Sequence, residues 1–307
     1  MKKVKNKKIL LFVVILSIFS GILISTVVLI FNGNKTEKKQ IVEQKKSPNL
    51  GDYVELKLEE GYKQESIKEK NGTGNYLFTV QQDLKWRILR RDNERENLIL
   101  VSEFPILTDN GEKIGFAGKQ GYWNVEEELN KICSIYGHGT GIKEAKSINA
   151  EDINTIIGYD KTREKDGTES KYGKQYFGFD NGIFLKEDGT EEIASKENII
   201  EPKLTSYSYS ALDYISKEDK AYELLFDNQY YWLATKGVGY CSVWAYYNIL
   251  SISNEEIRSN MVFSSDNETR EYSCGVRPIV VLNSSTKIDE ESGDGTIEKP
   301  YQLIVEK

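Results

Sequence analysis

An uninterrupted apolar run near the amino terminus constrains this chain more than any other feature. Residues 9–31 include no charged side chain and are rich in Ile, Leu, Val and Phe. As a helix rising about 1.5 Å per residue, the run would span roughly 34 Å, which exceeds a hydrocarbon core about 30 Å thick. We therefore predict a transmembrane helix over residues 9–31.

The flanks of this run favour an uncleaved signal anchor over a cleaved signal peptide. A signal peptide has a shorter apolar stretch, about 7 to 15 residues long, followed by a cleavage site of the small-x-small type. The sequence STVVLIFNGNK, residues 25–35, offers no such site. A buried core helix is disfavoured because the run is apolar on every face and its neighbours are rich in lysine.

The lysines around the span are equal in number on its two sides, so their count alone does not set its orientation. Five precede the span and five follow it: Lys2, Lys3, Lys5, Lys7 and Lys8, then Lys35, Lys38, Lys39, Lys45 and Lys46. The preceding tail is short and its charges lie directly against the span, which favours a cytoplasmic tail. We predict a single-pass protein of the cell membrane with a cytoplasmic tail (1–8), an anchor (9–31), a flexible stalk (32–50) and an extracellular domain (51–307).

The two parts of the chain differ in charge. Residues 1–50 hold ten lysines and two glutamates, a net charge of +8, so the remainder of a chain with net charge −7 carries −15. An acidic extracellular domain repels nucleic acid, which excludes nucleic acid as an expected partner. The expected partners are the membrane, through residues 9–31, and a glycan, cell-wall or protein ligand outside the cell.

Short strands separated by turns dominate the pattern after residue 50. Segments of strand length include GDYVEL, NYLFTVQ, KWRILRRD and NLILVSEFPIL. Asn181-Gly182 and Asp188-Gly189 are hairpin-turn pairs, because both tolerate a positive φ. The last hundred residues predict one packed antiparallel set of strands: QYYWLAT, YCSVWAYYNILS, IRSNMVFSS, GVRPIVVLN and YQLIVE.

Three short helices are expected among these strands. The first begins after Asn124 as its N-cap and stops at Gly137. Its apolar face consists of Val125, Leu129, Ile132, Cys133 and Tyr136. The second fits AEDINTIIG, residues 150–158, and the third begins at Ser216, where Ser-x-x-Asp is similar to a capping box.

Several of these segments also form an ordered set of motifs across residues 51–307. They are GDYV, KWRIL, NLILVS, LNKIC and AKSINAEDINTIIGY, followed by YWLAT, GVRPIVVLNSS and GDGTIEKPYQL. In this order they resemble DUF6273-type domains of membrane or secreted proteins from Gram-positive bacteria. That resemblance implies a C-type-lectin-like fold, as in formylglycine-generating enzymes: α+β, mostly antiparallel β, with a few short helices. It implies no established activity.

Histidine and cysteine do not form the patterns of common catalytic or metal centres. His138 is the only histidine and lies in a glycine-rich loop, so multi-histidine zinc sites are excluded. The cysteines lie far apart and form no C-x-x-C motif. Cys241 and Cys274 are expected on neighbouring strands, as a structural disulfide or as two buried thiols, and Cys133 is expected in the core. We predict no catalytic residue, no metal site and no cofactor.

Two groups of residues remain as binding candidates. In the strand around Cys241, alternation predicts one core face and a second face with Trp244, Tyr246 and Asn248. That second face is either buried as well or an aromatic surface suited to sugar rings. Asp266 and Asn267, next to Glu268, would hold Ca²⁺ if further oxygens converged there, and otherwise form a polar turn. The run Glu126 to Glu128 is interpreted as a solvated face.

The expected function is non-enzymatic: a membrane-anchored surface protein whose extracellular domain binds a ligand. One alternative is an enzyme related to formylglycine-generating oxidases, with Cys241 as its reactive group. Another is a structural component of a surface appendage, although the amino terminus lacks the Gly-Phe-Thr-Leu-x-Glu pattern of prepilins.

Overall fold

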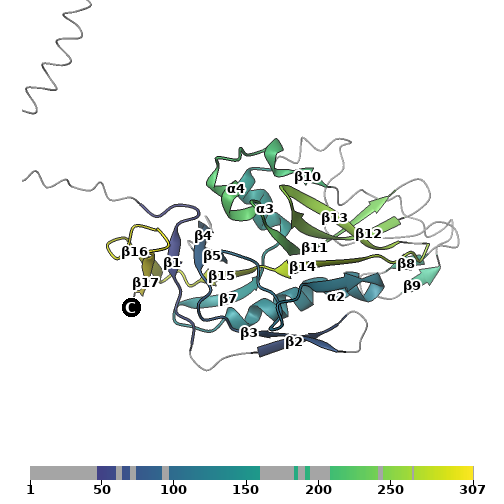
Figure 1. The fold of residues 1–307 in the computed structure, drawn as a ribbon, viewed down its shortest axis with the longest axis horizontal. Coiled ribbons are helices and arrows are strands. Elements are labelled where there is room, and N and C mark those ends of the chain that lie inside the picture. Colours follow the sequence, from purple (N-terminus) through teal and green to yellow (C-terminus); the bar gives the residue numbers. More distant parts are fainter. Residues whose placement is uncertain are drawn as a thin grey trace, which may run out of the picture. The chain divides into compact units, whose positions relative to one another are not determined.

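Two large β-sheets and three α-helices make up most of the chain that the structure describes (Figure 1). The computed structural model describes residues 47–59, 64–69, 74–91, 97–159, 183–185, 191–193, 208–240, 245–264 and 266–306. All of them belong to one compact unit, residues 46–307. The predicted tail and anchor, and residues 32–46 of the stalk, lie outside the described residues. Within the described residues, no helix is long and apolar enough to span a membrane.

The first sheet has seven strands in the order β16-β17-β1-β4-β5-β15-β7. These are β16 (Thr286–Asp289), β17 (Tyr301–Val305), β1 (Tyr53–Glu55), β4 (Trp86–Arg91), β5 (Leu98–Ser102), β15 (Pro278–Leu282) and β7 (Ile142–Ser147). The second sheet has six strands in the order β10-β13-β12-β11-β14-β6. These are β10 (Tyr209–Ser210), β13 (Glu256–Ser264), β12 (Ala245–Ser253), β11 (Tyr230–Tyr240), β14 (Glu271–Val276) and β6 (Ile114–Ala117).

Two hairpins complete the β structure. β2 (Gln64–Lys68) pairs with β3 (Asn75–Thr79), and β8 (Ile183–Leu185) pairs with β9 (Glu191–Ile193), both antiparallel. The predicted Asp188-Gly189 turn falls between β8 and β9, and it lies outside the described residues, as does Asn181-Gly182. The described domain is therefore mostly β-sheet with few helices, as predicted.

The predicted single antiparallel set in the last hundred residues is wrong. β11 to β14 belong to the six-stranded sheet, whereas β15 to β17 belong to the seven-stranded one. Two pairings are parallel, β11 with β14 and β1 with β17. The physical reason is that GVRPIVVLN is not one strand: β14 ends at Val276 and β15 begins at Pro278, so the chain passes from one sheet to the other at Arg277.

The helices confirm one prediction and correct two. α3 (Ala150–Ile157) occupies the predicted segment and ends before Gly158, as predicted; the structure adds that Asn149 and Asp152 form a capping box. α2 (Gly118–Cys133) begins six residues before Asn124, with Ala117 as its N-cap, because the chain turns into the helix directly from β6. α4 (Lys220–Leu225) begins after Ser216, since the Ser216 N–H donates to Asp219 Oδ2 (2.7 Å) in a turn that precedes the helix.

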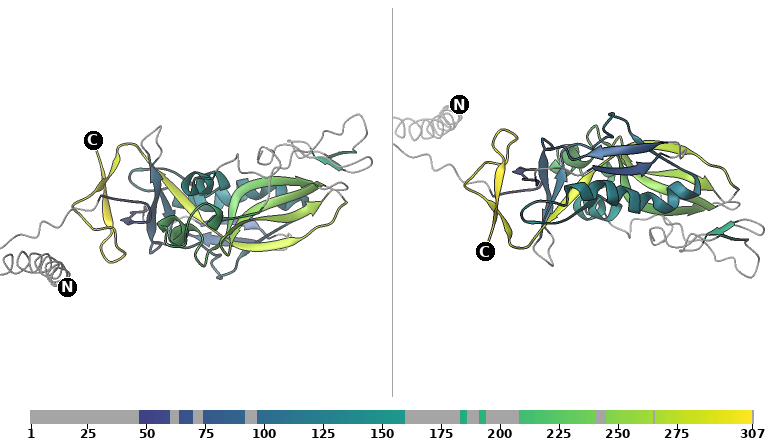
Figure 2. Two further views of the ribbon diagram at one scale, coloured as in Figure 1. Left: turned by 90° about the horizontal axis from the view of Figure 1, so that it is seen from above. Right: turned by 90° about the horizontal axis from the view of Figure 1, so that it is seen from below.

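The central strands of both sheets are covered on both faces, and successive residues of these strands enter different hydrophobic clusters. Leu98 and Leu100 of β5 join the cluster under α2, whereas Ile99 and Val101 join the cluster under α3 and α4. Figure 2 shows α3 and α4 on one side, and α2 with the hairpin β2–β3 on the other. Strands buried on both faces are apolar without interruption, which explains the run LILV.

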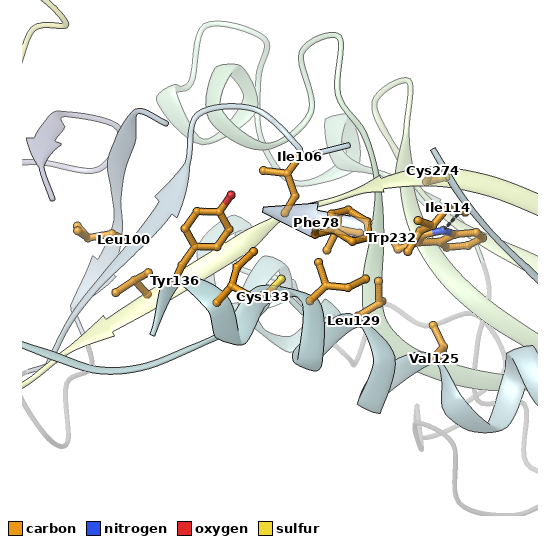
Figure 3. Packing of buried hydrophobic residues seen from close by; sticks show 14 of the residues in the cluster. Phe78, Leu100, Ile106, Ile114, Val125, Leu129, Cys133, Tyr136, Trp232 and Cys274 are labelled. Atoms are coloured by element: carbon orange, nitrogen blue, oxygen red, sulfur yellow. Dashed lines mark hydrogen bonds between the residues drawn. The ribbon is translucent and has the colours of Figure 1, made fainter. Parts of the chain in front are cut away.

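The face of α2 that points into the domain carries the predicted apolar side chains (Figure 3). Val125, Leu129 and Cys133 are fully buried against the sheets. Directly after α2, Tyr136 of the 3-10 helix η2 (Ser134–Tyr136) packs edge to face against Trp86, with ring centroids 5.6 Å apart. Trp232 donates its indole N–H to the Ile114 carbonyl (3.0 Å), which joins β11 to β6.

Arg277 lies at the junction of the two sheets and has no exposed surface. Its Nε (3.1 Å) and Nη2 (2.9 Å) both donate to the Ser102 carbonyl, and Nη2 also donates to the Glu103 carbonyl (2.9 Å). The guanidinium carbon lies 5.0 Å from the centroid of the Tyr231 ring. Burial lowers the pKa of Arg277. A buried cation of this kind is retained only because carbonyls and a ring replace its water.

The first and last strands of the described domain, β1 and β17, lie side by side. Val54 of β1 pairs with Tyr301 of β17, and the Tyr53 N–H donates to the Gly295 carbonyl (2.9 Å). Gly295 has φ +77°, and a Cβ there would lie 2.8 Å from both Asp52 Cβ and the Tyr301 ring. Only glycine fits this position, for conformational and for steric reasons.

Replacing Arg277 by methionine is expected to destabilise the domain by about 3 kcal/mol, because the Ser102 and Glu103 carbonyls lose their donor in a buried site. Urea unfolding of the purified protein in mild detergent, followed by tryptophan fluorescence, measures the change. The control is Arg258→Met on β13, whose side chain is 50% exposed and 3.5 Å from Glu256. Equal unfolding midpoints for the two variants would contradict the structural role of Arg277.

Gly295→Ala and Gly111→Ala separate steric from conformational cost. Gly111 has φ +78°, nearly the φ of Gly295, but a Cβ there meets nothing within 4 Å. Both variants therefore share the cost of a positive φ, and Gly295→Ala should lose about 2 kcal/mol more through overpacking. Thermal unfolding of the two variants measures the difference, and identical melting temperatures would show that the tie through β1 tolerates the methyl group.

Candidate functional site

The predicted aromatic face on β12 is not assembled as an exposed surface by the described residues. Asn248 is only 5% exposed, and its Nδ2 donates to the Tyr246 carbonyl (3.2 Å). Tyr246 is half-buried and lies opposite Ser264 of β13 and Gly239 of β11. Trp244 and Cys241 lie outside the described residues. β12 is a central strand with a bulge between Tyr247 and Asn248, so the amide is enclosed by its neighbours.

Asp266 and Asn267 lie in the exposed turn that follows β13. Asp266 Oδ1 accepts hydrogen bonds from the Ser264 hydroxyl and from the Glu268 N–H (3.3 Å). The Ser264 hydroxyl, together with that N–H, holds the pKa of Asp266 below its usual value. Asn267 adopts φ +71° and its N–H donates to the Ser264 carbonyl (2.9 Å). These two side chains thus shape a polar turn, and among the described residues no three His, Cys, Asp or Glu side chains converge on a metal position.

The thiols that the structure describes are buried and free. Cys133 has no exposed surface, and Cys274 is 6% exposed. Burial raises the pKa of Cys133 and raises that of Cys274 to about 11. At pH 8, a thiol with a pKa of about 11 has roughly one thiolate in 1000 molecules, which leaves little nucleophile. Neither thiol has the accessible surroundings of a reactive cysteine.

A cavity of about 250 Å³ lies along α2, bounded by β6 and by the end of β2. Figure 2 (right) shows the hairpin β2–β3 beside this helix. The cavity is lined by Ile67, Lys68, Glu69, Gly115, Phe116, Ala117, Gln120, Gly121, Asn124 and Glu128. We call it the α2 pocket. Its size is near the lower end of ligand sites in proteins, so it would hold one small ring or the end of a longer molecule.

Three polar side chains follow one stripe of α2 along this pocket. Gln120, Asn124 and Glu128 are spaced four residues apart, which places them one above the other on a helix. The Asn124 Nδ2 donates to Gln120 Oε1 (3.2 Å), so the two amides are oriented together. Ile67 and Phe116 are buried and supply an apolar floor. The lining therefore combines amide donors and acceptors, carboxylates and an apolar surface.

Glu128 differs from its two glutamate neighbours in sequence. Its Oε2 atom is buried and accepts no hydrogen bond within the part of the chain that the structure describes. Burial raises the pKa of Glu128, an effect that Lys131 opposes and Glu127 reinforces. Among the lining residues, Lys68 and Glu69 balance in charge, so Glu128 leaves the pocket with one negative charge.

A second cavity of about 590 Å³ lies where the chain continues past β1, beside residues 82–86, Ile297 and Pro300. Its aromatic group, Tyr53, is engaged in the fold: the phenol donates to Glu103, and the Arg87 guanidinium lies 4.8 Å from the ring centroid. Burial, followed by the bond to Glu103, raises the pKa of Tyr53 to about 12. The α2 pocket is the better candidate because it contains a buried acceptor that the described fold leaves unused.

Sequence reasoning missed the α2 pocket, although one signal for it was present. Residues 126–128 were interpreted as a solvated run of glutamates, yet Glu126 is half-buried, Glu127 is exposed and Glu128 faces the pocket. The signal was the spacing of Gln120, Asn124 and Glu128 on a stripe beside the apolar one. What the sequence did not show is that β2, some 50 residues earlier, packs beside that stripe.

Comparisons with protein-family models, curated proteins and solved structures found no match.

Cys133 and Cys274 should resist alkylation by iodoacetamide at pH 8 in the folded protein and react in denaturant. The reason is that burial both shields the thiols and suppresses their thiolates. Peptide mass spectrometry after timed labelling measures each residue, and labelling in denaturant without reductant provides the control. If Cys274 in the folded protein were labelled as fast as a thiol in a short peptide, its burial would be contradicted. If Cys274 stayed unlabelled in denaturant until a reductant was added, it would be part of a disulfide.

Proposed function

We propose that this chain is a membrane-anchored surface protein whose extracellular domain binds a small polar ligand, a glycan of the cell wall. The observation that carries this proposal is the α2 pocket, where hydrogen-bonding side chains stand over an apolar floor. Sugar rings have polar edges and apolar faces, so they require this combination of amides, carboxylates and flat apolar surface.

The accessibility of the polar stripe supports a binding role. Gln120 and Asn124 are exposed, whereas Val125 and Leu129 on the adjoining stripe of α2 are fully buried. The fold is thus held by one stripe of the helix, and the other is available to a ligand. Amides that stabilise no buried contact are free to recognise hydroxyl groups.

The alternative of an oxidase with a reactive cysteine has less support. Cys133 and Cys274 are buried thiols with raised pKa values, and Cys241 lies outside the described residues. An appendage component, the second alternative, has no described feature that favours it over binding.

The fold family and the membrane anchor belong to the same proposal. We assign the domain to the DUF6273-type, C-type-lectin-like group, with residues 9–31 as a single-pass anchor and the domain outside the cell. In support, the quoted motifs fall on successive elements of one compact unit, from GDYV at β1 to GDGTIEKPYQL at β17. The short tail, whose five lysines lie directly against the apolar run, supports the same topology.

The double substitution Gln120→Leu with Asn124→Leu should weaken binding to purified Gram-positive cell wall by at least about tenfold, because two hydrogen bonds to the ligand are lost. Sedimentation of the full chain, purified in mild detergent, with cell-wall fragments measures the affinity. The control is Glu127→Leu, an exposed position of the same helix outside the pocket, which should bind as wild type does. If the wild-type protein bound neither the cell wall nor any glycan on an array, the proposal would be wrong.

A further inference from the structure

The carboxylate of Glu128, the last residue of the polar stripe, is the charged group in the described domain that most clearly lacks a hydrogen-bond partner. Its Oε2 atom is enclosed and has no hydrogen-bond donor within the described residues. Leaving a buried acceptor without a donor costs about 1 to 3 kcal/mol, and more for a charged group. Most buried polar atoms in folded proteins have a partner, so an exception inside a cavity indicates where a ligand donor fits.

The nearby cations do not fill this role. Lys131 lies one turn further along α2, and its Nζ donates to the Ser66 carbonyl (2.9 Å) and lies 3.8 Å from Glu65 Oε2. Lys131 therefore ties α2 to β2 and lowers the pKa of Glu128 only from a distance. Lys68, on the opposite wall, is balanced by Glu69 within the same lining.

A cationic donor brought to Glu128 would also stabilise its ionised form. Burial raises the pKa of this carboxyl, with Glu127 adding to the effect. A cation at hydrogen-bond distance would lower that pKa again and would form a charge-assisted bond, which is stronger than a bond between neutral groups. A neutral hydroxyl would satisfy the acceptor but would not compensate the charge.

We propose that the α2 pocket recognises a protonated primary amine on a sugar ring, with Glu128 accepting from the ammonium group and Asn124 and Gln120 bonding the adjacent hydroxyls. This inference rests on the proposed ligand-binding function and names its ligand class as amino sugars with a free amine. The cavity of about 250 Å³ equals the liquid volume of roughly eight water molecules, which suits one such ring.

Two oligosaccharides that differ only in the amine test the inference. Chitosan tetramer carries free amines, whereas the tetramer of N-acetylglucosamine carries the same ring with neutral amides. Calorimetric titration of the full chain in mild detergent, at pH 6 and 150 mM salt, gives both affinities. The chitosan tetramer is expected to bind about tenfold tighter, since its ammonium group donates to Glu128 and also compensates the carboxylate charge, whereas a neutral amide can only donate.

The pair Glu128→Gln and Glu127→Gln separates the pocket from the general negative charge of the domain. Both substitutions remove one charge from adjacent residues of α2, so non-specific attraction of the cationic tetramer falls equally. Glu128→Gln should abolish the preference for the free amine, while Glu127→Gln should keep it within about twofold. Melting temperatures of both variants confirm that they remain folded.

The outcomes distinguish this inference from the broader proposal. Equal affinity for the two tetramers, or an equal effect of the two substitutions, overturns the role of Glu128. If the acetylated tetramer binds and the substitutions at Gln120 and Asn124 abolish that binding, the glycan-binding function stands without the amine. If neither tetramer nor cell wall binds, both proposals fail.

Discussion

The buried guanidinium of Arg277 is the interaction on which the arrangement of the two sheets depends. It bonds the carbonyls of Ser102 and Glu103, at the end of β5, from the point where β14 becomes β15. Its own carbonyl accepts from the Ile148 N–H (3.1 Å), next to the start of α3. One residue thus fixes the seven-stranded sheet, the six-stranded sheet and the helix that covers them. A side chain without hydrogen-bond donors at this position would leave the Ser102 and Glu103 carbonyls without this partner.

The candidate site follows from how α2 is held against those sheets. Its apolar stripe is buried, and β6 leads directly into its first turn, so the helix has little freedom to rotate or slide. The polar stripe must therefore face the side where β2 lies, and Lys131 joins the helix to that strand. A rigid helix presents side chains more precisely than a loop does, which makes the α2 pocket a better recognition surface than the turn around Asp266.

Local signals in the sequence were sufficient for local structure. The segment AEDINTIIG with its closing glycine predicted α3, because the hydrogen bonds of a helix and of its caps involve residues three or four positions apart. The start of α2 was misplaced because GKQG has weak helix propensity and only the junction with β6 makes it helical. The strands of the last hundred residues were found, but their division between two sheets was not. That division depends on contacts between Arg277 and β5, about 175 residues apart in sequence.

The pairing of β1 with β17 has a mechanical consequence. β1 is the first strand of the described residues, so tension that arrives from the amino-terminal side enters the seven-stranded sheet through this strand. β1 is held between β4 on one side and β17 on the other, with Gly295 clasped against Asp52. When such a strand is pulled along its length, the backbone hydrogen bonds on its two sides share the load and do not break one after another. Under the proposed anchoring, a domain attached in this way would resist extraction by force at its amino-terminal end, while α2, which takes no part in that attachment, would keep its place in the fold.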